Sequence, residues 1–228
     1  PQPRHQKSAR GVSQLTYEEA LEYIHAVSRA GSRPGLERIT ELCSLAGDPQ
    51  KKLCIVHVAG TNGKGSFCAM LSSVLQKAGK RVGTFTSPFV YRFNERIAVN
   101  GKPISDGELA DIIGRLKSLC DSMEDTPTEF ELLTAAGLLY FAEKACDVVV
   151  LEVGLGGRLD STNVIDAPRL AVISGIALDH TAILGDTAEA IAAEKAGIIK
   201  PGSTVLCGVM PKGAEDVIRA RAQTAGDD

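Results

Sequence analysis

A glycine-rich segment at residues 60–66 has the composition of a phosphate-binding loop. Glycines let backbone N–H groups turn toward an anion, and the positive end of a helix that we expect to begin at Ser66 attracts negative charge. Lys64 can reach phosphate oxygens, and Ser66 places a hydroxyl where Mg²⁺ would bridge them. The predicted loop comprises Gly60, Thr61, Asn62, Gly63, Lys64, Gly65 and Ser66.

The loop departs from the strict G-x-x-x-x-G-K-[ST] pattern, because Val58 replaces the first glycine and Gly65 directly follows the lysine. The alternative is a flexible glycine turn with a surface lysine. A position between a buried strand and a helix favours phosphate binding over that alternative.

An acidic residue ends another expected strand. Glu152 lies near the end of the apolar run 147–153, and ligands of open parallel sheets bind beyond the carboxyl ends of the strands. An unpaired carboxylate in so apolar a run is costly, which favours a metal ion over an interior arginine as its partner. The glycine-rich turn 154–160 follows at the same edge. It either brings backbone close to a second substrate or is simply a tight loop.

A histidine follows a third expected strand. His180 comes after the run 170–176, and a neutral histidine there is a candidate ligand for Mg²⁺ or Mn²⁺. Taken alone, it fits a hydrogen-bonded structural histidine better, because Mg²⁺ usually binds oxygen. Lys195, within the helical segment 187–196, taken alone predicts a solvent-exposed helix face. We interpret the remaining histidines as structural: His5, His25 and His57.

Strand-like and helix-like segments alternate along the chain, which would bring these residues to one edge of a sheet. Alternation of this kind predicts an α/β fold, with a P-loop-type, mostly parallel sheet and helices on both faces. The expected strands cover 53–59, 82–86, 147–153, 170–176 and 204–209, and Asn100-Gly101 predicts a hairpin joining 97–99 to 102–104. The expected helices cover 17–30, 67–78, 105–122, 128–145 and 187–196, with a short one through Ile39, Leu42 and Leu45. Ser105 with Glu108, and Thr128 with Glu131, have the spacing of a capping box at the start of a helix.

Composition excludes several classes of protein. The 228 residues carry 25 Lys and Arg against 28 Asp and Glu, which gives no support to a nucleic-acid or membrane-surface partner. No run approaches the roughly 20 apolar residues of a membrane span, and the start of the chain does not resemble a secretory signal. The six cysteines form no C-x-x-C pair, so we interpret them as reduced, buried thiols of a cytoplasmic protein.

Four longer motifs carry a resemblance to a known family. The segments GTNGKGS at 60–66, TSPFVYRFNERI at 86–97, LEVGLGGRLDSTNVI at 151–165 and ALDHTAILGDTAEAIAAEKAGIIK at 177–200 occur in this order. Together they resemble the folylpolyglutamate synthases, a family that includes the bifunctional dihydrofolate synthases and lies within the Mur ligase superfamily. The similarity extends from about residue 13 to 212.

The resemblance implies an ATP-dependent amide ligase. ATP would convert a substrate carboxylate to an acyl phosphate, and the amine of L-glutamate would displace the phosphate. The acid would be a reduced folate or dihydropteroate. The fold implied is the Mur ligase ATPase domain, and the partners implied are small molecules. We expect a monomer by default, because the sequence itself gives no oligomeric state.

The resemblance also implies roles for individual residues. Residues 60–66 would bind the nucleotide, with Lys64, His180 and Lys195 as catalytic residues. Lys195 matches a lysine that is carbamylated in the family. Ser66 and Glu152 would bind one Mg²⁺, and His180, with Glu152 and Ser87, would help to hold a second. A monovalent cation is a further cofactor. Phe130 and Asp160 match positions near the pterin.

The sequence also departs from the family pattern. Phe89 stands where many members have histidine, and Glu129 where an aromatic or apolar residue is common, so dihydropteroate is a less secure substrate than the ligase class. The family has a second, glutamate-binding domain with no counterpart here. We therefore expect residues 1–228 to form one truncated ATP-binding domain that does not ligate glutamate alone. The alternatives are a Mur-type ligase for a peptidoglycan precursor and a non-catalytic nucleotide-binding module.

Overall fold

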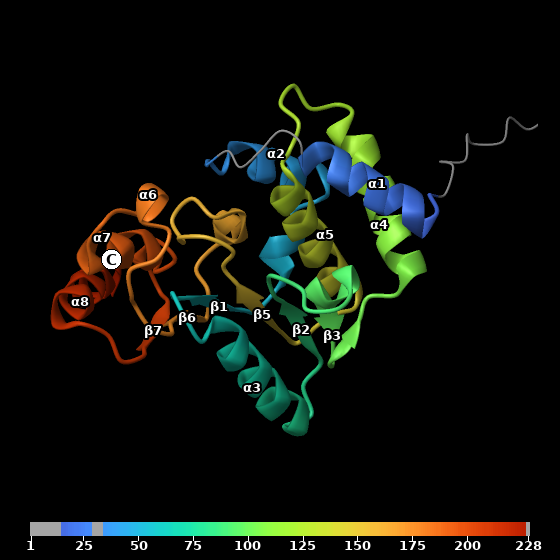
Figure 1. Ribbon diagram of the computed structural model, residues 1–228. Helices are drawn as coiled ribbons and strands as arrows, with labels where there is room; N and C mark the ends of the chain where they lie inside the picture. The colour runs from blue at the N-terminus through green and yellow to red at the C-terminus, as the bar shows by residue number, and fades with distance from the viewer. Residues whose placement is uncertain (1–14, 29–33, 227–228) are drawn as a thin grey trace, which may run out of the picture.

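A seven-stranded sheet forms the centre of the molecule, in a computed structural model that describes residues 15–28 and 34–226 (Figure 1). The strand order is β4-β3-β2-β5-β1-β6-β7. Five strands are parallel, and β3 and β4 form an antiparallel hairpin at one edge. The strands are β1 Ile55–Ala59, β2 Val82–Phe85, β3 Ile97–Val99, β4 Lys102–Pro103, β5 Val148–Glu152, β6 Leu170–Ile173 and β7 Thr204–Cys207.

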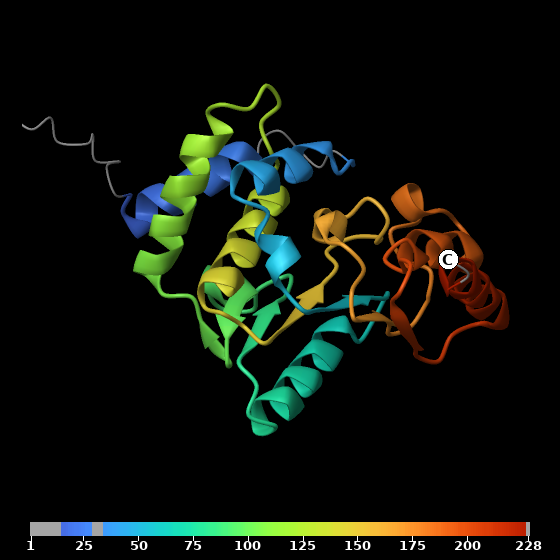
Figure 2. The same ribbon diagram turned by 180° about the vertical axis from the view of Figure 1, so that it is seen from behind.

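Helices cover both faces of this sheet, which confirms the predicted α/β class. In both views α3 lies on one face, and α5 lies on the other with α1, α2 and α4 outside it (Figures 1 and 2). The helices are α1 Tyr17–Ser28, α2 Glu37–Leu45, α3 Lys64–Lys77, α4 Asp106–Cys120, α5 Glu129–Glu143, α6 Thr181–Leu184, α7 Ala188–Ala196 and α8 Lys212–Gly226. Three short 3-10 helices connect them: η1 Pro49–Lys52, η2 Phe93–Arg96 and η3 Ser161–Val164.

The buried apolar side chains form a separate cluster on each side of the sheet. The largest cluster joins α1, α2, α4 and α5 to the sheet, and a smaller one lies beneath α3. A third cluster packs α7 and α8 together beside β6. The central strands β1 and β5 are buried on both faces, which explains why their sequences are almost continuously apolar.

Local sequence signals set most element boundaries. Ser105 and Thr128 each accept a hydrogen bond from the backbone three residues later, so both predicted capping boxes are confirmed. Asn100 has φ of 49° and Gly101 has φ of 72°, as the predicted hairpin turn requires. No helix in the described part of the chain is long and apolar enough to cross a bilayer.

Several boundaries and environments differ from the expectations. Helix α3 begins at Lys64, two residues before Ser66, where we expected it to begin. The reason is that Gly63 takes a left-handed conformation that caps the helix. Strand β7 ends at Cys207, and α8 was not predicted, since its buried positions are mostly small alanines that give a weak apolar period. Residues 29–30 of the first expected helix, and His5, lie outside the described residues.

The prediction of buried cysteines is wrong for two of the six. Cys54 precedes β1 and Cys207 lies on the edge strand β7, and both are exposed. An edge strand packs against a neighbour on one side only, so its side chains are covered less well than those of a central strand. The other four cysteines are buried, and none of the six forms a disulfide.

An aromatic ring occupies the space left by a glycine in β2. A Cβ atom added at Gly83 would lie 2.7 Å from the ring of Phe141, a residue of α5. We expect Gly83→Ala to lower the free energy of unfolding by about 1–3 kcal/mol, because neither the ring nor the strand can move freely. Chemical denaturation monitored by circular dichroism would measure the change.

Gly107 provides the matched control. It lies in the first turn of α4, and a Cβ atom there would meet nothing within 4 Å. Gly107→Ala should therefore leave stability unchanged or raise it by up to about 1 kcal/mol. Equal losses of stability in the two variants would contradict this account of the packing.

Candidate functional site

The loop between β1 and α3 is held open by hydrogen bonds to the segment after β6. The Thr61 N–H donates to the carbonyl of Gly175 at 2.8 Å, and the Ser174 hydroxyl donates to the carbonyl of Asn62 at 2.7 Å. Gly60 has φ of 149°, and a Cβ atom there would lie 2.0 Å from Oγ of Ser174. Glycine is therefore required at this position for conformation and for space.

Helix α3 begins directly at this loop. Gly63, with φ of 80°, turns the chain into the helix, and Ser66 lies exposed in its first turn. The first N–H groups of a helix have no partner within the helix and carry partial positive charge. The loop thus presents backbone donors and a hydroxyl at one exposed end, an arrangement that suits a phosphate chain.

Two lysine side chains converge on one carbonyl oxygen of the loop. Nζ of Lys64 donates to the Gly60 carbonyl at 3.0 Å, and Nζ of Lys195 donates to the same oxygen at 3.1 Å. Lys195 comes from α7 and is buried, unlike the exposed helix face that its local sequence alone predicts. Burial, together with the charge of Lys64, lowers the pKa of Lys195 to about 8.

Two glycines allow α7 to approach so closely. A Cβ atom at Gly157 would lie 2.8 Å from the Glu194 carbonyl oxygen, and one at Gly197 would lie 2.4 Å from Cβ of Arg158. The N–H of Arg158 donates to the Glu194 carbonyl at 2.8 Å. The second glycine-rich turn therefore fixes the helix that carries Lys195.

The carboxylate of Glu152 lies beside the same loop. It is buried at the end of β5, and Oε2 accepts a hydrogen bond from the Ser87 N–H at 3.2 Å. A Cβ atom at Gly65 would lie 3.9 Å from both carboxylate oxygens. Burial raises the pKa of Glu152, while the Ser87 amide and the charge of Lys64 partly oppose that rise. A cation here would stabilise the charged carboxylate.

His180 lies in a different environment from Glu152. Its side chain is exposed at the start of α6, its backbone has φ of 47°, and its N–H donates to the side chain of Asp179. Among the described residues, no three His, Cys, Asp or Glu side chains cluster closely enough to form a metal site. The structure thus brings together Ser87, Glu152 and the phosphate loop, but it shows no contact between His180 and Glu152.

A cavity of about 490 Å³ lies beside Ser87, the residue whose N–H donates to Glu152. Ser87 and Pro88 line it, and Phe130 and the turn 154–160 form much of its wall. Phe130 packs closely on this turn, because a Cβ atom at Gly154 would lie 2.6 Å from its ring. The predicted substrate residues Phe130 and Asp160 therefore border one cavity.

The carboxylate of Asp160, in the cavity wall, forms hydrogen bonds with neighbouring groups of the same chain. It accepts hydrogen bonds from the backbone N–H groups of Leu155 at 2.8 Å and Thr162 at 2.9 Å, and from the Thr162 hydroxyl. These hydrogen bonds therefore fix the conformation of the turn 154–160.

A buried histidine completes this arrangement and was treated only as structural in the sequence. Nε2 of His57 lies 2.8 Å from Oγ1 of Thr162. Because the Thr162 hydroxyl donates to Asp160, we infer that it accepts from His57, which assigns the proton to Nε2. Nδ1 of His57 is buried without a partner, as expected for this neutral tautomer. Nothing in the sequence linked these residues, because β1 and η3 meet only in the fold.

Comparison with known proteins shows similarity over most of the chain. The Mur ligase middle domain model matches residues 58–225. A dihydrofolate synthase/folylpolyglutamate synthase of Bacillus subtilis is 50% identical over 212 residues, which is 91% of this chain and 49% of that protein. This chain spans about half the length of the curated relatives it matches.

Solved structures are also similar to most of this chain. An FPGS–AMPPCP–folate complex has a TM-score of 0.89 and 40% identity, with coverage of 94% of this chain and 53% of that chain. Escherichia coli FolC in complex with DHPP and ADP has a TM-score of 0.84 and 35% identity, with coverage of 94% and 51%.

The buried His57 predicts a specific pH dependence of stability. Burial and the charge of Lys200 lower its pKa from 6.5 to about 3. Between these values the unfolded chain binds a proton that the folded chain does not, so stability falls with decreasing pH by up to about 1.4 kcal/mol per unit. Denaturation of the wild type and of His57→Gln from pH 7 to 4 would measure it.

His57→Gln removes the titrating imidazole but keeps an N–H donor near Thr162. The difference in free energy of unfolding between wild type and variant should therefore shrink as the pH falls. A difference that is constant over this range would show that His57 is not held neutral in the folded protein.

Proposed function

The chain belongs to the Mur ligase middle-domain family, and from this membership we propose that it acts in the ATP-dependent ligation of L-glutamate to a folate. The acid substrate is a reduced folate, with dihydropteroate as a second substrate. The family relatives named as folylpolyglutamate and dihydrofolate synthases support this proposal. We further propose that residues 1–228 form a monomeric ATP-binding domain in the cytoplasm.

The observation that carries the proposal is the junction of two sites at Ser87. The Ser87 N–H bonds to Glu152 beside the phosphate loop, and the same residue lines the cavity bounded by Phe130 and Asp160. A nucleotide on the loop and an acid in the cavity would meet there. A non-catalytic nucleotide-binding module has no need of such a junction.

The chemistry requires two anions to react. A carboxylate is a poor electrophile, so its oxygen first attacks the γ-phosphorus of ATP, and the bond from that phosphorus to the ADP oxygen breaks. The amine of L-glutamate then attacks the acyl carbon, phosphate leaves, and the amine loses a proton. In this scheme Lys64 and the loop N–H groups bind the phosphates and offset the repulsion between the two anions.

The residues present fit Mg²⁺. A buried carboxylate and a serine hydroxyl are oxygen ligands of the kind that Mg²⁺ prefers, and Glu152 and Ser66 both border the loop. These two residues would hold one ion, and Ser87, Glu152 and His180 are the predicted ligands of a second. When bound, Mg²⁺ neutralises phosphate charge. A monovalent cation is proposed as an additional cofactor.

Lys195 is suited to carbamylation. Its pKa of about 8 leaves an appreciable fraction as the neutral amine near pH 7.4. The ammonium group would first lose one proton; the neutral amine nitrogen would then attack CO₂ and release a second proton, so that a cation becomes an anionic carbamate. This change would relieve the repulsion between Lys195 and Lys64 that the unmodified structure contains.

The proposed activity has a direct test. The natural protein that contains this chain would be incubated with MgATP, L-glutamate and either tetrahydrofolate or 7,8-dihydropteroate. We expect mass spectrometry to detect a product heavier by one glutamate residue from tetrahydrofolate, and from dihydropteroate as well if the enzyme is bifunctional. ATP binding without product from either acid would instead favour a peptidoglycan-type ligase or a binding module.

Lys195 provides a second test. We expect Lys195→Ala to lower the rate of ligation at least tenfold, because both the carbamate and the contact with Gly60 are lost. Activity of the wild type should rise with added bicarbonate after CO₂ depletion, whereas activity of the variant should not respond. Full activity of the variant without bicarbonate would contradict the carbamate.

A further inference from the structure

An arginine in the cavity wall has no role in the arrangement described so far. Arg96 ends η2 and lines the cavity. Its Cζ atom lies 5.2 Å from the ring centroid of Phe89 and 5.6 Å from that of Phe93. The two rings cover part of the guanidinium, while its polar edge must find hydrogen-bond acceptors elsewhere.

Among the described residues, Arg96 has no carboxylate partner. Its Nε atom is buried and makes no hydrogen bond. Arg158, which lines the same cavity, is paired with Glu194 at 2.8 Å. The charge of Glu129 opposes the lowering of the Arg96 pKa, but among the described residues its carboxylate forms an ion pair within 4.0 Å only with His25. Burial lowers the pKa of Arg96, which means that the surrounding groups do not fully replace the water lost by its guanidinium.

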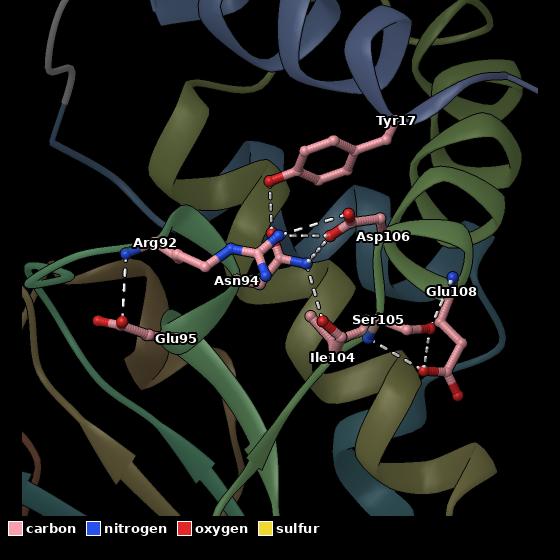
Figure 3. Close-up of polar contacts among 8 residues, drawn as sticks. All are labelled: Tyr17, Arg92, Asn94, Glu95, Ile104, Ser105, Asp106 and Glu108. Atoms are coloured by element: carbon pink, nitrogen blue, oxygen red, sulfur yellow. Dashed lines mark hydrogen bonds and ion pairs between the residues drawn. The ribbon is translucent and has the colours of Figure 1, made fainter.

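Hydrogen bonds hold the residues just before Arg96, and Figure 3 shows those of Asn94 and Glu95. Asn94 accepts a hydrogen bond from the Tyr17 hydroxyl at 2.6 Å and donates to the Ile104 carbonyl and the Asp106 carboxylate. Glu95 accepts bonds from the N–H groups of residues 90, 91 and 92. The backbone next to Arg96 is therefore fixed by contacts of Asn94 with α1 and α4. Less conformational entropy is then lost when a ligand binds to Arg96.

The backbone also joins Arg96 to the junction of the two sites. The Thr86 N–H donates to the Arg96 carbonyl at 3.0 Å, and Ser87 follows with its bond to Glu152. We propose that Arg96 binds a carboxylate of the acid substrate and thereby selects anionic ligands for this cavity. The inference rests on the proposed function. A planar carboxylate can accept two parallel hydrogen bonds from a guanidinium, which matches the unpaired edge.

A comparison of an acid with its ester tests this role. Isothermal titration would measure binding of 7,8-dihydropteroate and of its methyl ester, with Mg²⁺ and a nonhydrolysable ATP analogue present. Wild type should bind the acid roughly 10- to 100-fold more tightly, the range expected for a hydrogen bond to a charged group. Arg96→Gln should abolish that preference and leave binding of the ester unchanged.

The ester separates charge recognition from a general disturbance of the cavity, since misfolding would weaken binding of both ligands. Arg158→Gln is the matched control, because Arg158 is already paired, and it should retain the preference for the acid. Retention of the preference in Arg96→Gln, or its loss in both variants, would overturn the role of Arg96 alone. Failure of the wild type to bind either ligand would overturn the proposed function as well.

Discussion

One carbonyl oxygen, that of Gly60, accepts hydrogen bonds from two lysine side chains, and the functional half of the structure is organised around it. Lys64 lies on the loop itself, and Lys195 arrives from α7. Two like charges this close, with one of them buried, repel each other at a cost that an anion would remove. The proposed carbamate on Lys195 would be such an anion, because it replaces one of the two positive charges with a negative one.

Close packing at glycines makes this convergence possible. Gly157 and Gly197 allow α7 to touch the turn 154–160, and Gly60 allows the phosphate loop to touch the segment after β6. A Cβ atom at any of the three positions would lie less than 3 Å from the facing segment, so a side chain there would separate the elements. The same turn forms the cavity wall and is kept in shape by Asp160, Thr162 and His57. Helix α7 therefore contacts both the loop, through Lys195 and Gly60, and the turn that forms the cavity wall.

Local patterns predicted much of the fold. Continuous apolar runs identified β1 and β5, two capping boxes located the starts of α4 and α5, and Asn100-Gly101 located the hairpin. These features depend on residues close together in the chain. The pattern failed for α8, where alanines fill the buried positions, and for the exposure of Cys54 and Cys207, which depends on neighbouring elements.

The sequence by itself determined the phosphate loop, the acidic strand end and the family resemblance, because each depends on short runs of contiguous residues. Only the tertiary structure decided the environments of single side chains. It buried Lys195, linked His57 to Asp160 through Thr162, and left Arg96 without a carboxylate partner among the described residues. Burial and pairing arise from residues distant in the chain, and they set the charge state and hence the chemistry of each group.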